Sequence, residues 1–257
     1  MRHLILHAQA YGPYRRQLLN HMRIDVTEIV RELSASLVKL GTDKRNHITV
    51  DIEGEDEEFV GNVLLQRYGG VSEFGALSTD STFRGQLVDV GKVGYGLYCD
   101  IGIMGPPKMD VLVPLHNLRS QLSMPKSSLR TISSTLVLVD HLPVEVRITE
   151  IDSAHHKTTG ELAESTLSRI KRWAGDDHQR LLVLGCTKNI IEDALTKSGH
   201  SQDIYQIEKL GHFEFSLRCK RSTRASGILA AIGPRLKGVP MHLFIPEEVG
   251  ERYNAKA

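Results

Sequence analysis

The sequence predicts an α+β protein whose central part is a small β-barrel. Residues 82–166 contain several runs in which apolar and polar side chains alternate, and glycines separate these runs. Alternation with glycine punctuation is typical of short strands joined by tight turns. The flanking segments, 1–78 and 167–257, combine strand-like runs with apolar stripes at helical spacing. We therefore expect three domains with these boundaries, which suits a chain of 257 residues.

The central segment carries four clear runs of strand character. They are Phe83 to Val90, Leu97 to Ile101, Val111 to Leu115 and Val144 to Ile151. Glycines lie inside or beside these runs at positions 85, 94, 96 and 102, where sharp bends and bulges close a small barrel. We expect residues 82–166 to form one closed, five-stranded barrel.

The first 78 residues predict a βαβα unit. Leu4 to Ala8 has the character of a strand, and an apolar stripe at spacings of three and four then runs from Leu18 to Leu40. This spacing indicates one amphipathic helix, or two in succession, ended by Gly41. Ile48 to Ile52 is the second expected strand, and the stripe from Phe59 to Leu65 is the second expected helix.

The segment after the barrel begins with a predicted helix and continues in the order strand, helix, hairpin, helix, strand. These elements are the helix Glu161 to Trp173, the strand Leu181 to Gly185, a helix capped by Thr187, a hairpin from Ile204 to Lys220, the helix Ala225 to Ile232 and the strand Met241 to Ile245. The order βαββαβ is that of the ferredoxin-like α/β sandwich, so we expect this fold in the C-terminal domain.

Bulk composition favours a soluble globular protein. Apolar residues make up 40% of the chain, charged residues 25%, and the formal net charge is +1, so any attraction to a polyanion must be local. Cys99, Cys186 and Cys219 lack metal-binding spacing and indicate buried thiols in a reducing compartment. No stretch is long and apolar enough to span a membrane. We expect a cytoplasmic protein with no membrane partner.

No motif supplies a specific catalytic constellation. The phosphate-binding loop, the nucleophile elbow and the zinc-protease motif are absent from the sequence. Cys186 stands at a predicted helix start, where a thiol pKa can be lowered, but the sequence places no histidine or acid beside it. We therefore expect no catalytic residue, no cofactor and no bound metal.

The order of parts in the central segment resembles the S1 RNA-binding domain, a branch of the OB-fold. The resemblance rests on Tyr95 and Tyr98, on the strand that continues LVPLHNL, and on a strand that ends Glu150-Ile151-Asp152 before a basic turn. In that family two aromatic residues three positions apart lie on the exposed face of the barrel. The resemblance implies that Tyr95 and Tyr98 contact RNA.

The same resemblance implies further members of the RNA-binding patch. Asp152 matches the acid at the end of the fourth strand, and His156 or Lys157 takes the basic place that follows. The family often has a histidine where this chain has Pro114. His116 lies two residues further on, and we expect it on the same strand face.

A second basic feature lies in the C-terminal domain. From residue 169 to residue 237 there are thirteen lysines and arginines against seven acids. Arg218, Lys220, Arg221 and Arg224 cluster at a predicted strand end and turn. Such clusters contact phosphates without reading bases, so we expect a phosphate-only contact here.

The whole chain is similar to an archaeal family of conserved, uncharacterised proteins. This likeness rests on the N-terminal unit, the S1-like barrel and the segment KLGHFEFSLRCK…GILAAIGPRLKG. We expect a non-enzymatic protein of translation or RNA processing that binds single-stranded or looped RNA through its barrel. The expected partners are ribosomal or transfer RNA and a ribosomal or RNA-processing protein. Two alternatives stay open, namely an RNA-acting enzyme with its site in a flanking domain and a protein–protein adaptor.

Overall fold

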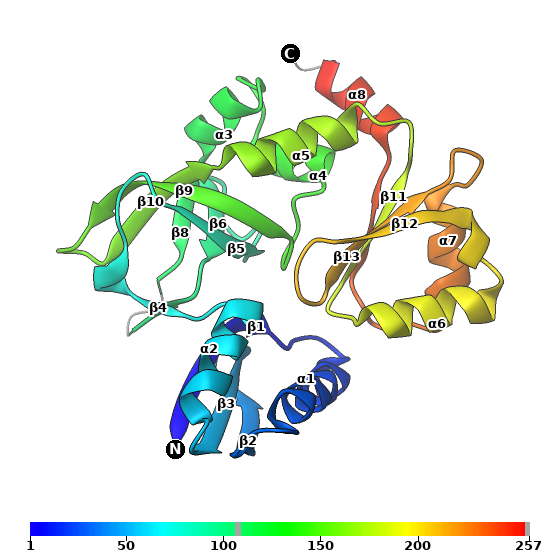
Figure 1. Cartoon of the computed structure of the whole chain (residues 1–257). Coiled ribbons are helices and arrows are strands. Elements are labelled where there is room, and N and C mark those ends of the chain that lie inside the picture. Colours follow the sequence, from blue (N-terminus) through cyan, green and yellow to red (C-terminus); the bar gives the residue numbers. More distant parts are fainter. Residues whose placement is uncertain (106–108, 255–257) are drawn as a thin grey trace.

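The computed structural model describes residues 1–105 and 109–254, which form three units packed against one another (Figure 1). The N-terminal unit contains a three-stranded sheet, the middle unit a closed barrel, and the C-terminal unit a four-stranded sheet. This architecture confirms the predicted α+β class and the barrel at its centre.

The N-terminal unit has one strand more than the sequence predicted. Its elements are β1 (Arg2–Gln9), α1 (Arg15–Val30), β2 (Ala35–Thr42), β3 (His47–Gly54) and α2 (Glu57–Tyr68). β3 lies between β1 and β2 and is antiparallel to both. Both helices pack on the sheet face that carries Ile48, Val50 and Ile52.

The prediction of helix up to Leu40 was wrong, because β2 occupies the second half of that apolar stripe. Leu37 pairs with Ile52 and Leu40 pairs with Val50, with a bulge between them. The bulge adds one residue to the strand, so two leucines three positions apart face the same core. That spacing is the one that indicates a helix when only the sequence is known.

The barrel consists of five strands. They are β5 (Thr82–Val88), β6 (Gly96–Asp100), β8 (Val111–Pro114), β9 (Pro143–Asp152) and β10 (Lys157–Leu162). The strand order is β10-β8-β6-β5-β9, and pairing of β9 with β10 closes the barrel. β8 and β10 are parallel, whereas the other neighbours are antiparallel. A short parallel pair, β4 (Ser72–Glu73) with β7 (Ile103–Met104), and the single turn η1 (Phe74–Ala76) connect the barrel to the N-terminal unit.

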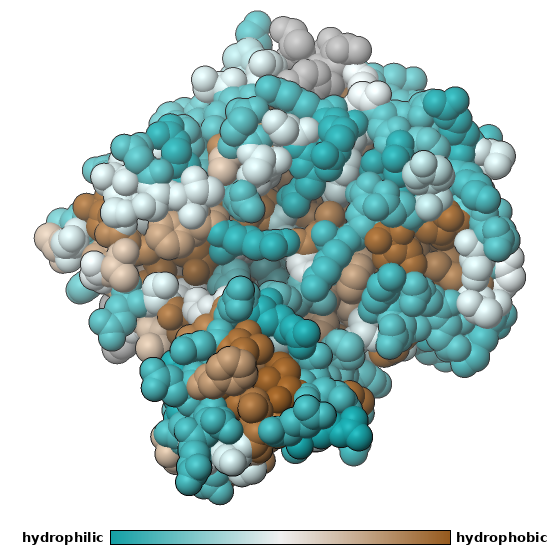
Figure 2. Space-filling model, in the orientation of Figure 1, coloured by the Kyte–Doolittle hydropathy of each residue, from teal (hydrophilic) through white to brown (hydrophobic). Residues whose placement is uncertain are grey.

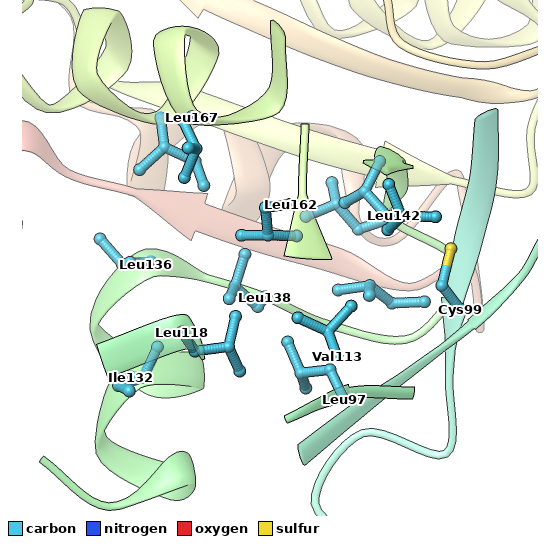
Figure 3. Packing of buried hydrophobic residues seen from close by; sticks show 14 of the residues in the cluster. Leu97, Cys99, Val113, Leu118, Ile132, Leu136, Leu138, Leu142, Leu162 and Leu167 are labelled. Atoms are coloured by element: carbon cyan, nitrogen blue, oxygen red, sulfur yellow. The ribbon is translucent and has the colours of Figure 1, made fainter. Parts of the chain in front are cut away.

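Helices pack against the barrel and share its hydrophobic core (Figure 3). They are α3 (Leu115–Gln121), α4 (Leu129–Leu136) and α5 (Glu164–Ala174). Their side chains Leu118, Ile132 and Leu167 share one core with Leu97 and Val113 of the strands. The sequence did not predict α3 and α4. α5 begins three residues later than predicted, because β10 continues to Leu162.

The C-terminal unit has the predicted βαββαβ order. Its elements are β11 (Arg180–Leu184), α6 (Lys188–Ser198), η2 (Ser201–Asp203), β12 (Ile204–Lys209), β13 (Glu214–Cys219), α7 (Ala225–Ile232), β14 (Met241–Phe244) and α8 (Pro246–Asn254). The antiparallel order β12-β13-β11-β14 confirms the ferredoxin-like sheet. Leu182 and Phe244 belong to the same core cluster as the barrel and α5, and the Phe244 ring meets Trp173 of α5 at 5.4 Å between centroids. The middle unit therefore packs on the sheet face that α6 and α7 leave open.

The three units meet at the buried side chain of Glu214. The Tyr11 hydroxyl donates to the Glu214 carboxyl at 2.8 Å, and the backbone N–H of Phe213 donates to it at 3.2 Å. The Tyr11 ring stacks on His141 of the barrel, with 3.6 Å between ring centroids. Burial raises the pKa of Glu214 to about 7. One carboxyl therefore touches the N-terminal and C-terminal units beside a barrel residue.

Hydrophilic side chains cover most of the face shown in Figure 2, and hydrophobic ones gather in separate patches, one of them over the N-terminal unit. Ile24, Val38 and Phe59 are among the exposed apolar residues of that unit. No helix in the described part of the chain combines the length and the apolar character that crossing a membrane requires.

Candidate nucleic-acid interface

Tyr95 and Tyr98 form a fixed pair at the start of β6. Their hydroxyls are 2.7 Å apart, and their rings meet edge to face with 6.3 Å between centroids. The hydrogen bond to Tyr95, together with burial, raises the pKa of Tyr98 to about 12. Tyr95 is 55% exposed. The pair therefore presents an aromatic ring to solvent in a defined orientation.

The strand register extends this aromatic surface across the barrel. Tyr98 lies opposite Leu112 of β8, and Leu112 lies opposite Thr159 of β10. Lys157 precedes Thr159 by two residues, so its side chain leaves the same face of β10. We call this surface, defined by Tyr95, Tyr98, Leu112, Lys157 and Thr159, the barrel face. It brings together the two predicted aromatic residues, Tyr95 and Tyr98, and the predicted basic residue Lys157.

Asp152 and His156 lie at the edge of the barrel face, in the turn between β9 and β10. Asp152 pairs in register with Lys157. The His155 ring contacts the Asp152 carboxylate at 2.7 Å, and this hydrogen bond holds the pKa of Asp152 below its usual value. His156 is exposed, and its ring packs edge-on against Phe74 at 5.5 Å. The predicted acid is therefore bonded to His155, whereas the predicted His156 packs on Phe74.

The expectation that His116 continues the strand was wrong. β8 ends at Pro114, and α3 begins at Leu115, so His116 is an exposed residue of the first helical turn. Proline has no backbone N–H with which to continue a ladder. The Leu115 N–H donates to the Tyr95 carbonyl at 2.8 Å. His116 therefore directly follows a residue that is hydrogen-bonded to Tyr95.

The predicted basic cluster of the C-terminal unit is partly neutralised by acids. Arg218 pairs with Asp176 at 3.0 Å and stacks over Tyr205, with 5.1 Å from its central carbon to the ring centroid. Arg221 pairs with Asp177 at 2.6 Å. Lys220 and Arg224 are exposed, and neither has an ion-pair partner among the described residues. Two of the four predicted phosphate contacts are therefore available without breaking an ion pair.

The acids that neutralise this cluster belong to a group with metal-ligand spacing. Asp176, Asp177 and His178 have ligand atoms within 4.8 Å of one another. Asp176 binds Arg180 and Arg218, and Asp177 binds Arg221. Since guanidinium groups already occupy the carboxylates, the arrangement is that of an ion-pair network.

Cys186 does not have the properties of a reactive thiol. It is fully buried, and burial raises its pKa to about 12. The helix start at Lys188 does not offset this desolvation. The suggestion that the helix start lowers the pKa of Cys186 was therefore wrong.

A polar contact that the sequence did not predict joins the N-terminal unit to the barrel. Arg45, in the turn between β2 and β3, reaches Asp100 at 2.8 Å and also contacts Asp110. Gln9 donates to Asp100 at 3.0 Å, and the His47 ring lies 3.5 Å from the same carboxylate. A cavity of about 250 Å³ opens beside this contact. These residues are far apart along the chain, so no spacing within the sequence predicts the contact.

Comparison with known families gives matches along most of the chain. Residues 3–73 match the N-terminal domain of DUF2110, residues 77–174 its central domain, and residues 178–243 its C-terminal domain. No curated protein matches the chain in sequence.

Two solved structures are among those to which the chain is similar. One is an uncharacterized protein from Methanocaldococcus jannaschii, with 10% identity and a TM-score of 0.24 over 34% of this chain and 95% of that one. The other is the a/eIF2alpha–aDim2p–rRNA complex from Pyrococcus horikoshii, with 12% identity and a TM-score of 0.26 over 48% of this chain and 64% of that one. At these TM-scores neither likeness supports a conclusion about function.

Proposed function

The chain belongs to the DUF2110 family, and we propose that it is an RNA-binding protein that holds single-stranded or looped RNA on its barrel face. The observation that carries the proposal is the fixed pair of Tyr95 and Tyr98, with one ring 55% exposed. Bases stack on exposed aromatic rings whatever their sequence. Unstacked bases occur in single strands and loops, which is why such surfaces select them.

Charged residues around the barrel face supply the backbone contacts in this proposal. Lys157 extends from the same face as the tyrosines and binds a phosphate of the stacked strand. Asp152, His156 and His116 lie at the edges of the barrel face, beside the bound RNA strand. Lys220 and Arg224 of the C-terminal unit form a separate, phosphate-only contact, to which Arg218 and Arg221 contribute less because acids hold them.

The cellular setting that we propose is translation or RNA processing in the cytoplasm, with ribosomal or transfer RNA as the partner. Support for this setting comes from the S1-like order of the barrel elements. The protein acts without chemistry of its own in this proposal.

Binding of a short unstructured RNA, measured by fluorescence anisotropy, tests the proposal. Replacing Tyr95 and Tyr98 together by alanine removes both stacking surfaces and is expected to cost about 2–4 kcal/mol of binding free energy. The salt dependence is expected to stay almost unchanged, because stacking releases no counterions. Phe59→Ala is the matched control, since Phe59 is also more than half exposed but lies on α2.

Equal affinity of the double variant and the parent would show that the barrel face is not the RNA site. The adaptor alternative would then describe the barrel better. The variant Tyr95→Phe with Tyr98→Phe keeps both rings and loses only the hydroxyl pair, so it is expected to retain most of the affinity.

A further inference from the structure

The cavity between the N-terminal unit and the barrel is lined by strand residues that neighbour Tyr98 of the barrel face. Val88 lines the cavity and pairs in register with Tyr98. Asp100 of the same strand lies two residues after Tyr98 and also lines the cavity. Because side chains two positions apart leave the same face of a strand, a strand of RNA stacked on Tyr98 has the cavity as its next neighbour.

The opposite wall of the cavity is a turn of the N-terminal unit that is fixed in place. The Asp43 carboxylate accepts the backbone N–H groups of Arg45 and His47, each at 2.8 Å. The Asn46 carbonyl accepts the N–H of Ala10 at 2.8 Å. The Arg45 guanidinium ties the turn to the barrel through Asp100. The wall is therefore preorganised, which reduces the entropic cost of binding.

Three side chains of this fixed lining have hydrogen-bonding capacity to spare. In the described part of the chain, neither the Lys44 ammonium nor the Asn46 amide has a hydrogen-bond or ion-pair partner. Asp140 accepts the Val90 N–H at 2.7 Å through one carboxylate oxygen, which leaves the other oxygen as an acceptor. The lining thus offers hydrogen-bond donors from the N-terminal unit and a hydrogen-bond acceptor from the barrel unit.

The chemistry of this lining suits a nucleobase. Lysine and arginine stand among three aspartates, Asp89, Asp100 and Asp140, so the cavity does not select a bare anion. Its volume of about 250 Å³ is below the range of about 300–1,000 Å³ typical of drug-sized ligands, which fits a single ring system. Bases in single strands are recognised by hydrogen bonds to their edges after they leave the stack.

We propose that the cavity receives one unstacked base of the RNA that lies on Tyr95 and Tyr98, and that it prefers a base with an exocyclic amino group. An ionised carboxylate can only accept hydrogen bonds. The free oxygen of Asp140 therefore pairs with the amino group of adenine, cytosine or guanine, whereas uracil presents no such group. Asn46 binds a second position on the base edge, and Lys44 contacts the adjacent phosphate at the rim. This inference rests on the proposed function and adds base selectivity to it.

Competition between short RNAs tests the proposal on the full chain. The probes are an oligouridine and the same oligomer with one internal uridine replaced by adenosine, cytidine or guanosine. A contact of this kind discriminates by about 5-fold to 150-fold, which is about 1–3 kcal/mol at 1.4 kcal/mol for each factor of ten. The parent is therefore expected to bind at least one substituted oligomer about tenfold more tightly than oligouridine.

Two variants assign that preference to the cavity. Asp140→Asn keeps an oxygen for the Val90 N–H but turns the free acceptor into a donor, so the preference is expected to fall to about one or shift towards uridine. Asn46→Gly removes the amide and suits the backbone, because Asn46 has φ of 67°. Lys44→Ala is expected to weaken all four RNAs alike, and Lys126→Ala, on an exposed connection between α3 and α4, is its charge-matched control.

The outcomes separate base selectivity from RNA binding itself. Binding of all four oligomers with equal affinity, or an undiminished preference in Asp140→Asn and Asn46→Gly, overturns the base-selective cavity and leaves the barrel face intact. Failure of the parent to bind any of the RNAs overturns the proposed function and this inference together.

Discussion

The barrel face and the basic cluster of the C-terminal unit are both rich in groups that suit RNA, but they use these groups differently. On the barrel face, Tyr95 and Lys157 are directed to solvent. In the cluster, Arg218 and Arg221 face acids of the loop that precedes β11. The excess of basic residues counted along this segment therefore overstates the charge that a ligand meets. Whether a basic side chain is free or paired with an acid depends on sheet register and on the position of nearby loops.

Replacing Arg180 is expected to change stability more than any other substitution discussed. Arg180 is a buried arginine whose ion pairs stabilise the C-terminal unit. It is 1% exposed, pairs with Asp176 at 2.7 Å and Glu208 at 2.9 Å, and stacks on Trp173. Arg180→Ala leaves two carboxylates without their buried cation and is expected to cost about 3–5 kcal/mol of unfolding free energy.

Urea unfolding of the Arg180 variant measures this loss. Arg172→Ala, on the exposed side of α5, is the control and is expected to change stability by no more than about 0.5 kcal/mol. A loss below about 1 kcal/mol for Arg180→Ala would mean that the network is weak and that its arginines are available for other partners.

Glu214 gives the next largest effect, at the place where the C-terminal unit joins the other two. Burial raises its folded-state pKa to about 7 from an ordinary value of 4.5, so the folded protein holds the proton more tightly than the unfolded chain. The resulting stabilisation is fully present below pH 4.5 and is lost as the pH rises through 7. At about 1.36 kcal/mol for each pH unit between the two pKa values, the change is roughly 3 kcal/mol.

The variant Glu214→Gln isolates this contribution. Burial lowers the pKa of His7, His141 and His212, and these groups act in the opposite sense in parent and variant alike. The difference in unfolding free energy between the two proteins is therefore expected to change by a few kcal/mol between about pH 5 and about pH 8, with the parent losing stability relative to the variant. A pH-independent difference would show that Glu214 is ionised in the fold.

A smaller effect distinguishes the free from the paired cations within the cluster. Lys220→Ala with Arg224→Ala removes two unpaired charges and is expected to reduce the salt slope of RNA binding by about 0.7 for each phosphate that is no longer neutralised. Arg218→Ala with Arg221→Ala removes charges that acids already offset, so it is expected to change the slope less. Anisotropy titrations across a salt series give both slopes, and equal slopes for the two double variants would mean that ion pairing does not withhold these arginines from RNA.

The sequence predicted the parts of the fold that depend on local patterns. Alternation located β5, β6, β8 and β9, and the element order identified the C-terminal sheet. β2 was missed because the bulge between Leu37 and Lys39 gives a strand the spacing of a helix. The prediction that His116 lies on the strand face was wrong, because β8 ends at Pro114 and α3 begins at Leu115.

The candidate site was predictable only where residues lie close together in the chain. Tyr95 and Tyr98 were expected together because of the resemblance to the S1 domain. A spacing of three would by itself place two side chains on opposite faces of a regular strand, and the two tyrosines meet because Tyr95 precedes β6. Arg45 meets Asp100 and Asp110 across two units, and Arg218 meets Asp176 from a distant segment of the same unit. Such contacts arise when whole elements and units pack together. The pattern of residue types within one segment does not show which distant segment it will meet.

The central claim is that RNA bases lie on the barrel face, and photochemical crosslinking tests it most directly. A short unstructured RNA is irradiated in complex with the full chain, and mass spectrometry identifies the crosslinked residues. We expect base crosslinks at Tyr95 or Tyr98 that disappear in the alanine variants. Crosslinks confined to the cluster of residues 218–224, with none on the barrel face, would contradict it.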